Sequence, residues 1–219
     1  MPATDRRRGP TYGRKFTLTR RALILAAPCL LLPAAARALA PTPTTGDGPF
    51  YPSRLPADID SDLVKIEGAV REAGGDILRL AGIVRDAKGR PLTGARVEIW
   101  QCDVNGVYLE SGSYGGRRDQ GFQGFGHAIA DAEGRFRFRT IVPVPYTGRT
   151  PHIHVKVLKG GRAVLTSQLY RTGFPQNASD FLFRRLSAAE QERVSMVLTP
   201  TTETKRPTFE TEVTLVVDG

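Results

Sequence analysis

The chain has 219 residues and a formal net charge of +9, from 31 Lys and Arg against 22 Asp and Glu. This length fits one domain of ordinary size with a short leader. Residues 1–40 hold eight of the basic residues and a single acid, which leaves 23 basic and 21 acidic residues in the rest. Since the surplus charge lies in the first 40 residues, the composition argues against a basic nucleic-acid-binding surface, and we expect no nucleic-acid partner.

The first 40 residues have the pattern of an export signal. The pair Arg20-Arg21 precedes an apolar run over 22–32, and Ala38-Leu39-Ala40 provides a small-x-small cleavage site. Paired arginines before a moderate apolar stretch are typical of a twin-arginine signal. A membrane anchor is the alternative, but Pro28 interrupts the run and Pro33 follows it, and the run is shorter than the roughly 20 apolar residues of a spanning helix. We therefore expect a signal at 1–40, export to the periplasm or cell exterior, and no membrane span after its removal.

The rest of the chain reads as strands and turns. Residues 41–48 form a linker rich in Pro, Thr and Gly, and residues 49–219 form the folded domain. Ser187 with Glu190 three residues later is a capping box, which predicts one short helix over 187–198. Several strands with a single helix imply an all-β fold, an antiparallel β-sandwich. Apolar periodicity bounded by turns predicts strands over residues 77–85, 95–102, 135–139, 152–158, 163–170 and 208–217.

Two of the three histidines lie two positions apart in a predicted strand. His152 and His154 therefore point to the same face and can share one metal ion, while Ile153, Val155 and Val157 point to the core. A His-x-His strand is compatible with zinc, copper or iron.

Two tyrosines extend this candidate ligand set. Tyr146 lies six positions before His152, and Tyr108 lies upstream. The pKa of a free phenol is near 10 and must be lowered by the bound ion, which a trivalent metal does best. Two phenolates and two neutral imidazoles therefore suit Fe(III) and leave a position open for water or substrate. The alternative is that both tyrosines are amphipathic core residues and the histidines form a polar strand face; spacing alone leaves both interpretations open.

Cys102 and His127 also have side chains that can bind metals, but each also has an ordinary structural interpretation. Cys102 has no intramolecular partner outside the leader, so we expect no disulfide and, instead of a thiol ligand, a small buried hydrophobe. For His127 we expect a solvent-facing or hydrogen-bonded strand residue, with an outer role around the metal as the alternative.

Three separated motifs resemble the intradiol ring-cleavage dioxygenase family. In chain order they are Gly48-Pro49-Phe50-Tyr51, the run from Val97 to Asp103 that leads through Gly106 to Tyr108, and Gly148-Arg149-Thr150-Pro151-His152-Ile153-His154. The similarity runs from about residue 48 to 217. It implies a non-haem Fe(III) enzyme that cleaves a catechol-type ring between its two hydroxylated carbons with O2, giving a cis,cis-muconate-type diacid. The implied partners are a small catechol-type aromatic and O2, and a homo-oligomer is left open.

Site residues follow from the same resemblance, motif by motif. Arg149 matches the family's active-site arginine, and Gln168 matches a glutamine near the position where ligands exchange. Tyr146 would be the ligand that the substrate displaces, so these three residues carry the implied catalytic roles. The implied metal ligands are Tyr108, Tyr146, His152 and His154.

The sequence departs from the family's pattern at two places. Tyr146 lies closer to the first histidine than in better characterised members, and the N-terminal region has no room for a helical dimerisation domain. Tyr114 is a rival for the first phenolate, although Tyr108 occupies the family's Gly-x-Tyr position. A second hypothesis is a metal-free sandwich module, since residues 81–95 also resemble transthyretin-like and carboxypeptidase-regulatory domains, which bind ligands or proteins.

Overall fold

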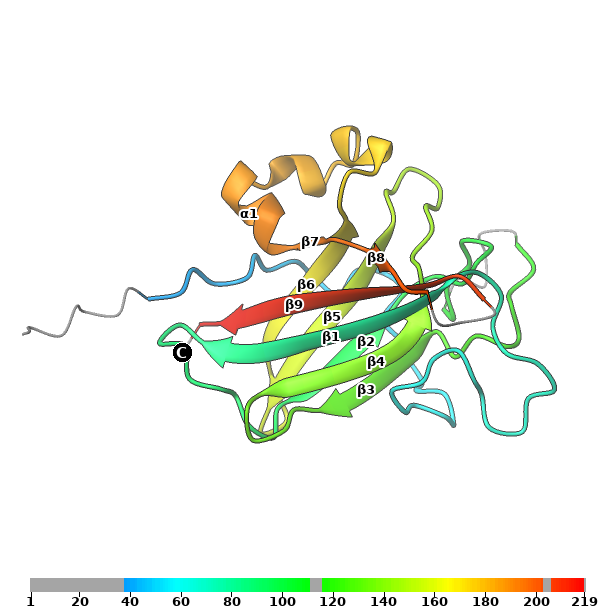
Figure 1. Cartoon of the computed structure of the whole chain (residues 1–219), viewed down its shortest axis with the longest axis horizontal. Coiled ribbons are helices and arrows are strands. Elements are labelled where there is room, and N and C mark those ends of the chain that lie inside the picture. Colours follow the sequence, from blue (N-terminus) through cyan, green and yellow to red (C-terminus); the bar gives the residue numbers. More distant parts are fainter. Residues whose placement is uncertain (1–37, 111–115, 203–205, 219) are drawn as a thin grey trace, which may run out of the picture. The chain divides into compact units, whose positions relative to one another are not determined.

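The computed structural model describes residues 38–110, 116–202 and 206–218 (Figure 1). The twin arginines of the leader and Tyr114 lie outside these residues. Within them, no helix combines the length and the apolar character that crossing a bilayer requires.

Two β-sheets form the folded domain, with a helical excursion between β6 and β7 (Figure 1). One sheet has the strand order β4(Arg135–Ile141)-β1(Ile77–Asp86)-β9(Thr208–Val217)-β8(Thr199–Pro200). The other has the order β3(Phe125–Ile129)-β2(Arg96–Trp100)-β5(His152–Lys159)-β6(Arg162–Arg171)-β7(Ser195–Met196). The excursion contains two short 3-10 helices and one α-helix, η1(Pro175–Ala178), η2(Phe183–Arg185) and α1(Ala188–Arg193).

The predicted β-sandwich is confirmed, and alternation along the strands builds its core. Ile153, Val155 and Val157 of β5 are buried in one apolar cluster with Phe136 and Phe138 of β4, so inward residues of both sheets meet there. Burying each such side chain contributes roughly 1.5–3 kcal/mol. The opposite face of β5 is thereby left to carry the two histidines.

Strand direction departs from the expected antiparallel pattern at two places. β1 pairs with β9 in parallel register from Ile77↔Thr208 to Asp86↔Val217, and β6 pairs with β7 in parallel as well. Both sheets are therefore mixed. Side-chain alternation reports which face of a strand is buried but carries no information on the direction of its neighbour, so the sequence pattern could not reveal these two pairings.

Predicted strand ends agree with the structure to within two residues, but the helix was predicted too long. Glu190 accepts a hydrogen bond from the Ser187 backbone N–H at 2.8 Å, as the capping box requires. The helix covers only Ala188–Arg193. It ends there because Ser195 and Met196, which follow the C-cap residue Val194, pair with β6 as β7. β3 was expected only as a strand around His127, without bounds, and the two-residue strands β7 and β8 were not predicted.

The segment predicted as a linker is tied to both sheets. Thr42 exchanges two hydrogen bonds with Val216 of β9, each of 2.9 Å. Further along, the Thr45 N–H donates to the Thr166 carbonyl of β6 at 2.8 Å, and the Lys156 ammonium contacts the Asp47 carboxylate at 2.7 Å. Composition alone gave no indication of these contacts, which place residues 44–48 beside the face of β5 that carries the histidines.

Candidate metal centre and active site

The rings of the two β5 histidines, His152 and His154, bring one nitrogen each close together. Both are buried, and their Nε2 atoms lie 3.3 Å apart. The Nδ1 atom of His152 lies 2.7 Å from the Thr150 carbonyl, so it is the protonated nitrogen and Nε2 carries the lone pair. Nδ1 of His154 is buried and has no hydrogen-bond partner among the described residues. Two imidazole nitrogens held at this separation in a buried site are arranged to share a cation.

Two phenols complete the cluster. The Tyr108 hydroxyl lies 3.3 Å from Nε2 of His152, although the residues are 44 positions apart in the chain. The Tyr108 and Tyr146 rings meet edge to face, with centroids 5.3 Å apart, and their hydroxyls are hydrogen-bonded. The structure thus brings together all four residues that the sequence proposed as metal ligands. In the described part of the chain no cluster of three or more His, Cys, Asp or Glu competes with them.

The protonation states of the four side chains indicate which ion they suit. Burial lowers the pKa of His152 to about 4 and that of His154 well below its ordinary value, so both imidazoles are neutral and able to ligate at neutral pH. Burial raises the pKa of Tyr108 and Tyr146, so both phenols keep their protons without a cation. A hard ion of high charge would be needed to displace those protons, and the donor set fits such an ion.

A glycine allows the two tyrosine-bearing loops to approach. Gly106 has φ +76°, and a Cβ added there would lie 3.3 Å from Cβ of Tyr146. Both the left-handed backbone and the close approach favour glycine at this position.

We expect Gly106→Ala to disturb the metal centre. The left-handed strain alone costs about 1–2 kcal/mol, and the added methyl group pushes against Tyr146. Gly68→Ala is a matched control, because Gly68 also has φ +76° but no neighbour within 4 Å of an added Cβ. Thermal unfolding should show similar destabilisation of both variants, whereas metal content per folded chain should fall only for Gly106→Ala. Equal metal contents would show that this contact does not position the tyrosines.

A buried arginine stands beside Tyr146. The Arg149 side chain is only 10% exposed, and its Nε atom donates to Asp180 at 2.8 Å. The remaining guanidinium nitrogens donate to the side-chain Oε1 of Gln168 at 2.6 Å and to the Tyr146 hydroxyl at 3.4 Å. The Tyr170 hydroxyl also donates to Gln168, at 2.8 Å. These contacts hold a fixed positive charge beside the phenol of Tyr146.

Sequence reasoning missed several residues that support the site. Asp180, which anchors Arg149, lies in a loop without periodic signal. Trp100 stacks on His154 with ring centroids 4.7 Å apart and an interplanar angle of 14°. Tyr170 could have been found, since it lies two positions after Gln168 on the same strand and therefore on the same face.

His127 and Cys102 have the ordinary structural roles that the sequence predicted for them. Nδ1 of His127 lies 2.6 Å from the Ile59 carbonyl, as expected for a hydrogen-bonded strand histidine. Cys102 is buried, and burial raises its pKa to about 12, so it remains a thiol in the apolar cluster around Trp100.

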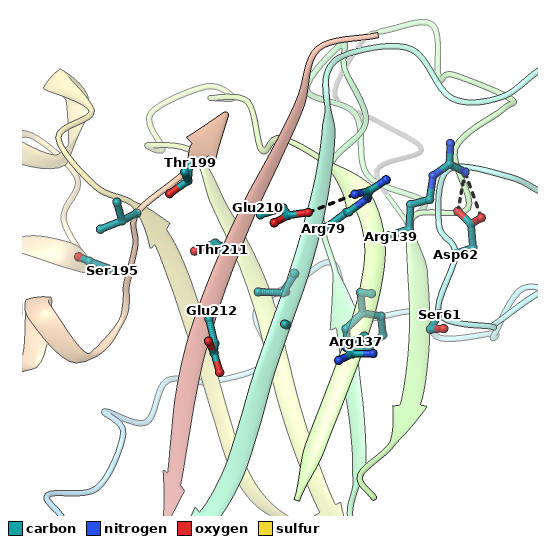
Figure 2. Close-up of a pocket in the computed structure, with 14 residues that line it drawn as sticks. Ser61, Asp62, Arg79, Arg137, Arg139, Ser195, Thr199, Glu210, Thr211 and Glu212 are labelled. Atoms are coloured by element: carbon teal, nitrogen blue, oxygen red, sulfur yellow. Dashed lines mark hydrogen bonds and ion pairs between the residues drawn. The ribbon is translucent and has the colours of Figure 1, made fainter. Parts of the chain in front are cut away.

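Two cavities are candidates for the substrate site. The larger, of about 860 Å³, lies on the outer face of the β4-β1-β9 sheet, where Arg79 pairs with Glu210 at 3.1 Å and Arg139 with Asp62 at 3.0 Å (Figure 2). No Tyr, His or Cys lines it. The smaller, of about 430 Å³, adjoins the Tyr/His centre, and we assign it as the candidate site. It is lined by Thr44, Thr45, Gly46, Gly48, Pro49, Phe50, Tyr146, Arg149, His154, Gln168, Tyr170, Phe181, Leu182, Arg185 and Leu186.

Several known proteins are similar to this chain in sequence. A catechol 1,2-dioxygenase from a Pseudomonas species is 32% identical over 184 residues, which cover 70% of this chain and 55% of that protein. The protocatechuate 3,4-dioxygenase beta chain of Burkholderia cepacia is 32% identical over 157 residues, covering 67% and 66%. Residues 46–218 match a family model described as "Dioxygenase". The chain belongs to the intradiol dioxygenase family.

A solved structure agrees with this membership. The dioxygenase domain of a fusion of a dioxygenase with a carbohydrate-binding protein, from Streptomyces sp. SirexAA-E, is 34% identical with a TM-score of 0.63. The match covers 82% of this chain and 99% of that domain. By contrast, the chain spans about half to two thirds of the length of the curated relatives described above. Membership in the intradiol dioxygenase family confirms the resemblance of the three motifs and gives no support to the metal-free module.

Proposed function

We propose that the protein is a non-haem Fe(III) dioxygenase that cleaves a catechol-type ring between its hydroxylated carbons. Both atoms of O2 enter the product, so that a catechol and O2 give a cis,cis-muconate-type diacid without loss of atoms. The observation that carries this proposal is the convergence of two phenols and two imidazoles, with Nε2 of His152 3.3 Å from both Nε2 of His154 and the Tyr108 hydroxyl.

The donor set fits Fe(III) as the resident ion. A bound Fe(III) would supply the charge that keeps the ligand phenols and a chelating catechol ionised, and would make the ring reactive towards O2. Tyr108, Tyr146, His152 and His154 are the proposed ligands.

The two proposed phenolate ligands differ in their access to substrate. Tyr108 is buried and lies outside the cavity lining, whereas Tyr146 is half-buried and lines it. Tyr146 is therefore the phenol that a substrate oxygen can replace, and its freed oxygen is placed to accept a substrate proton. Arg149 donates to this oxygen, so its guanidinium lies where negative charge develops on the substrate.

Metal and gas analysis test the proposal directly. Protein purified in air should contain about one iron per chain and show the visible band of tyrosinate-to-Fe(III) charge transfer, which should move to longer wavelength when a catechol is added. Under labelled O2, both oxygen atoms should appear in the diacid. Stoichiometric zinc, or a colourless metal-free protein, would overturn the proposal.

The choice between Tyr108 and Tyr114 is tested separately. Tyr108→Phe should remove most of the charge-transfer colour, because it deletes the phenol beside His152. Tyr114→Phe should leave the spectrum and the iron content nearly unchanged. The reverse result would transfer the ligand role to Tyr114.

We also propose that residues 1–40 are a twin-arginine signal that exports the folded protein to the periplasm or cell exterior. Its removal would leave residues 41–48 attached to the dioxygenase domain predicted over 49–219. Changing Arg20 and Arg21 together to Lys should retain the protein in the cytoplasm, in an iron-containing form, because the export pathway reads this pair. Cell fractionation measures the result. Continued export of the variant would contradict the assignment.

A further inference from the structure

We propose that Arg185 selects catechols that carry an anionic ring substituent such as a carboxylate. The inference rests on the proposed function and names the substrate class of the same cavity. Residues 44–46, from the segment after the expected leader, would provide a second polar contact to that substituent.

The charge of the cavity is the first argument. Its lining contains two arginines and no Asp or Glu. Arg149 is neutralised by the buried Asp180 at 2.8 Å. Arg185 forms no ion pair with any residue in the described part of the chain, so the cavity keeps one uncompensated positive charge. A partly enclosed cavity with a single sign of charge attracts ligands of the opposite sign.

Both arginines of the cavity lie beside the ring of Phe181. Cζ of Arg149 lies 5.3 Å from the centroid of the Phe181 ring, and Cζ of Arg185 lies 5.8 Å from the same centroid. Phe181 is 54% exposed, so it stands where the cavity opens to solvent. A catechol whose oxygens lie near Tyr146 and Arg149 would therefore direct a ring substituent towards Arg185.

An unsatisfied hydroxyl is the second, independent argument. Oγ1 of Thr45 is buried and has no hydrogen-bond partner among the described residues, and Thr45 lines the cavity. The residue is fixed by its own N–H, which donates to Thr166, and by the nearby ion pair between Asp47 and Lys156. A buried hydroxyl without a partner is costly, and rotation of the Thr45 side chain about its Cα–Cβ bond would turn the hydroxyl towards the cavity, where a carboxylate oxygen would accept its hydrogen bond.

Discrimination between two matched ligands tests the inference. The carboxylate 3,4-dihydroxybenzoate and its neutral isostere 3,4-dihydroxybenzamide differ in charge but scarcely in shape. Their dissociation constants are measured by calorimetry without O2, and their kcat/KM values with O2. We expect the native protein to prefer the carboxylate. Arg185→Gln should weaken its binding and lower its kcat/KM by about 10–100-fold, the range for loss of a charge-assisted hydrogen bond, while the amide changes by less than about threefold.

Arg184→Gln is the matched control, since Arg184 is exposed like its neighbour Arg185 but does not line the cavity. It should leave both ligands unaffected. Thr45→Val should lower carboxylate affinity by roughly fivefold, as for a neutral hydrogen bond. If Arg185→Gln leaves the carboxylate-to-amide ratio unchanged, or if Arg184→Gln changes it equally, the inference is wrong even when both catechols are cleaved. Failure to bind iron or to cleave any catechol would instead refute the proposed function.

Discussion

His152→Ala should lose both iron and turnover. The substitution removes the ring nitrogen that lies 3.3 Å from both His154 and the Tyr108 hydroxyl, so it deletes the donor at the centre of the cluster. The remaining phenols have pKa values raised by burial and would keep their protons without a firmly held cation. Iron per chain should fall from about one to near zero, the charge-transfer colour should vanish, and activity should drop below detection.

His127→Ala is the matched control for this loss. His127 is also a strand histidine, but its ring contacts the Ile59 carbonyl at 2.6 Å and does not belong to the Tyr/His cluster. The variant loses one hydrogen bond, worth about 1 kcal/mol, and should retain iron, colour and most of its activity. Retention of iron by His152→Ala, with colour intact, would show that the ligands lie elsewhere.

The alternation of side chains along a strand was enough to predict the two histidines of the site, which lie on a single strand. The two-residue repeat of an extended chain places His152 and His154 on one face and Ile153 on the other, and β5 has this arrangement. The capping box likewise located the start of α1. Such features depend only on neighbours in the chain, so one sequence is enough to predict them.

Contacts between distant segments were beyond this kind of reasoning. The tyrosines entered the ligand set through spacing and the family resemblance. The residues around Tyr108 give no indication that its side chain contacts His152, which lies 44 positions away in the chain. Asp180 had no signal at all, because a single acid in an irregular loop looks the same whether it is solvated or buried against Arg149. The parallel pairing of β1 with β9 could not be predicted either, because it too joins segments that are far apart in the chain.

The segment over residues 41–48 shows how composition can mislead. Its Pro, Thr and Gly content is typical of a linker, yet Thr42 and Thr45 form backbone hydrogen bonds with β9 and β6. Extended residues with small side chains can lie along a sheet without apolar periodicity. The resulting wall of the cavity, with the buried hydroxyl of Thr45, is therefore a feature of the structure that the sequence pattern did not indicate.

Arg149→Ala should separate metal binding from charge stabilisation. A guanidinium stays protonated and offers no lone pair, so Arg149 is not a ligand, and the variant should keep its iron, its colour and the spectral shift with a catechol. Turnover should nevertheless fall by about 10²–10³-fold, as is typical when a preorganised charge-stabilising group is removed. Iron analysis and single-turnover kinetics on the same preparation measure both effects.

The contacts of Asp180 indicate that Arg149→Ala should still fold. Loss of Arg149 leaves the Asp180 carboxylate buried, but backbone N–H groups of Thr150, Leu182 and Phe183 still donate to it at 3.0–3.1 Å. The carboxylate therefore remains satisfied in part, and the chain should stay folded. Arg149→Lys keeps the charge but cannot contact Asp180, Gln168 and Tyr146 together, because the ammonium lacks the planar fork of a guanidinium. Its turnover should lie between those of the native protein and Arg149→Ala. Native turnover in Arg149→Ala would mean that the developing negative charge is stabilised by another residue.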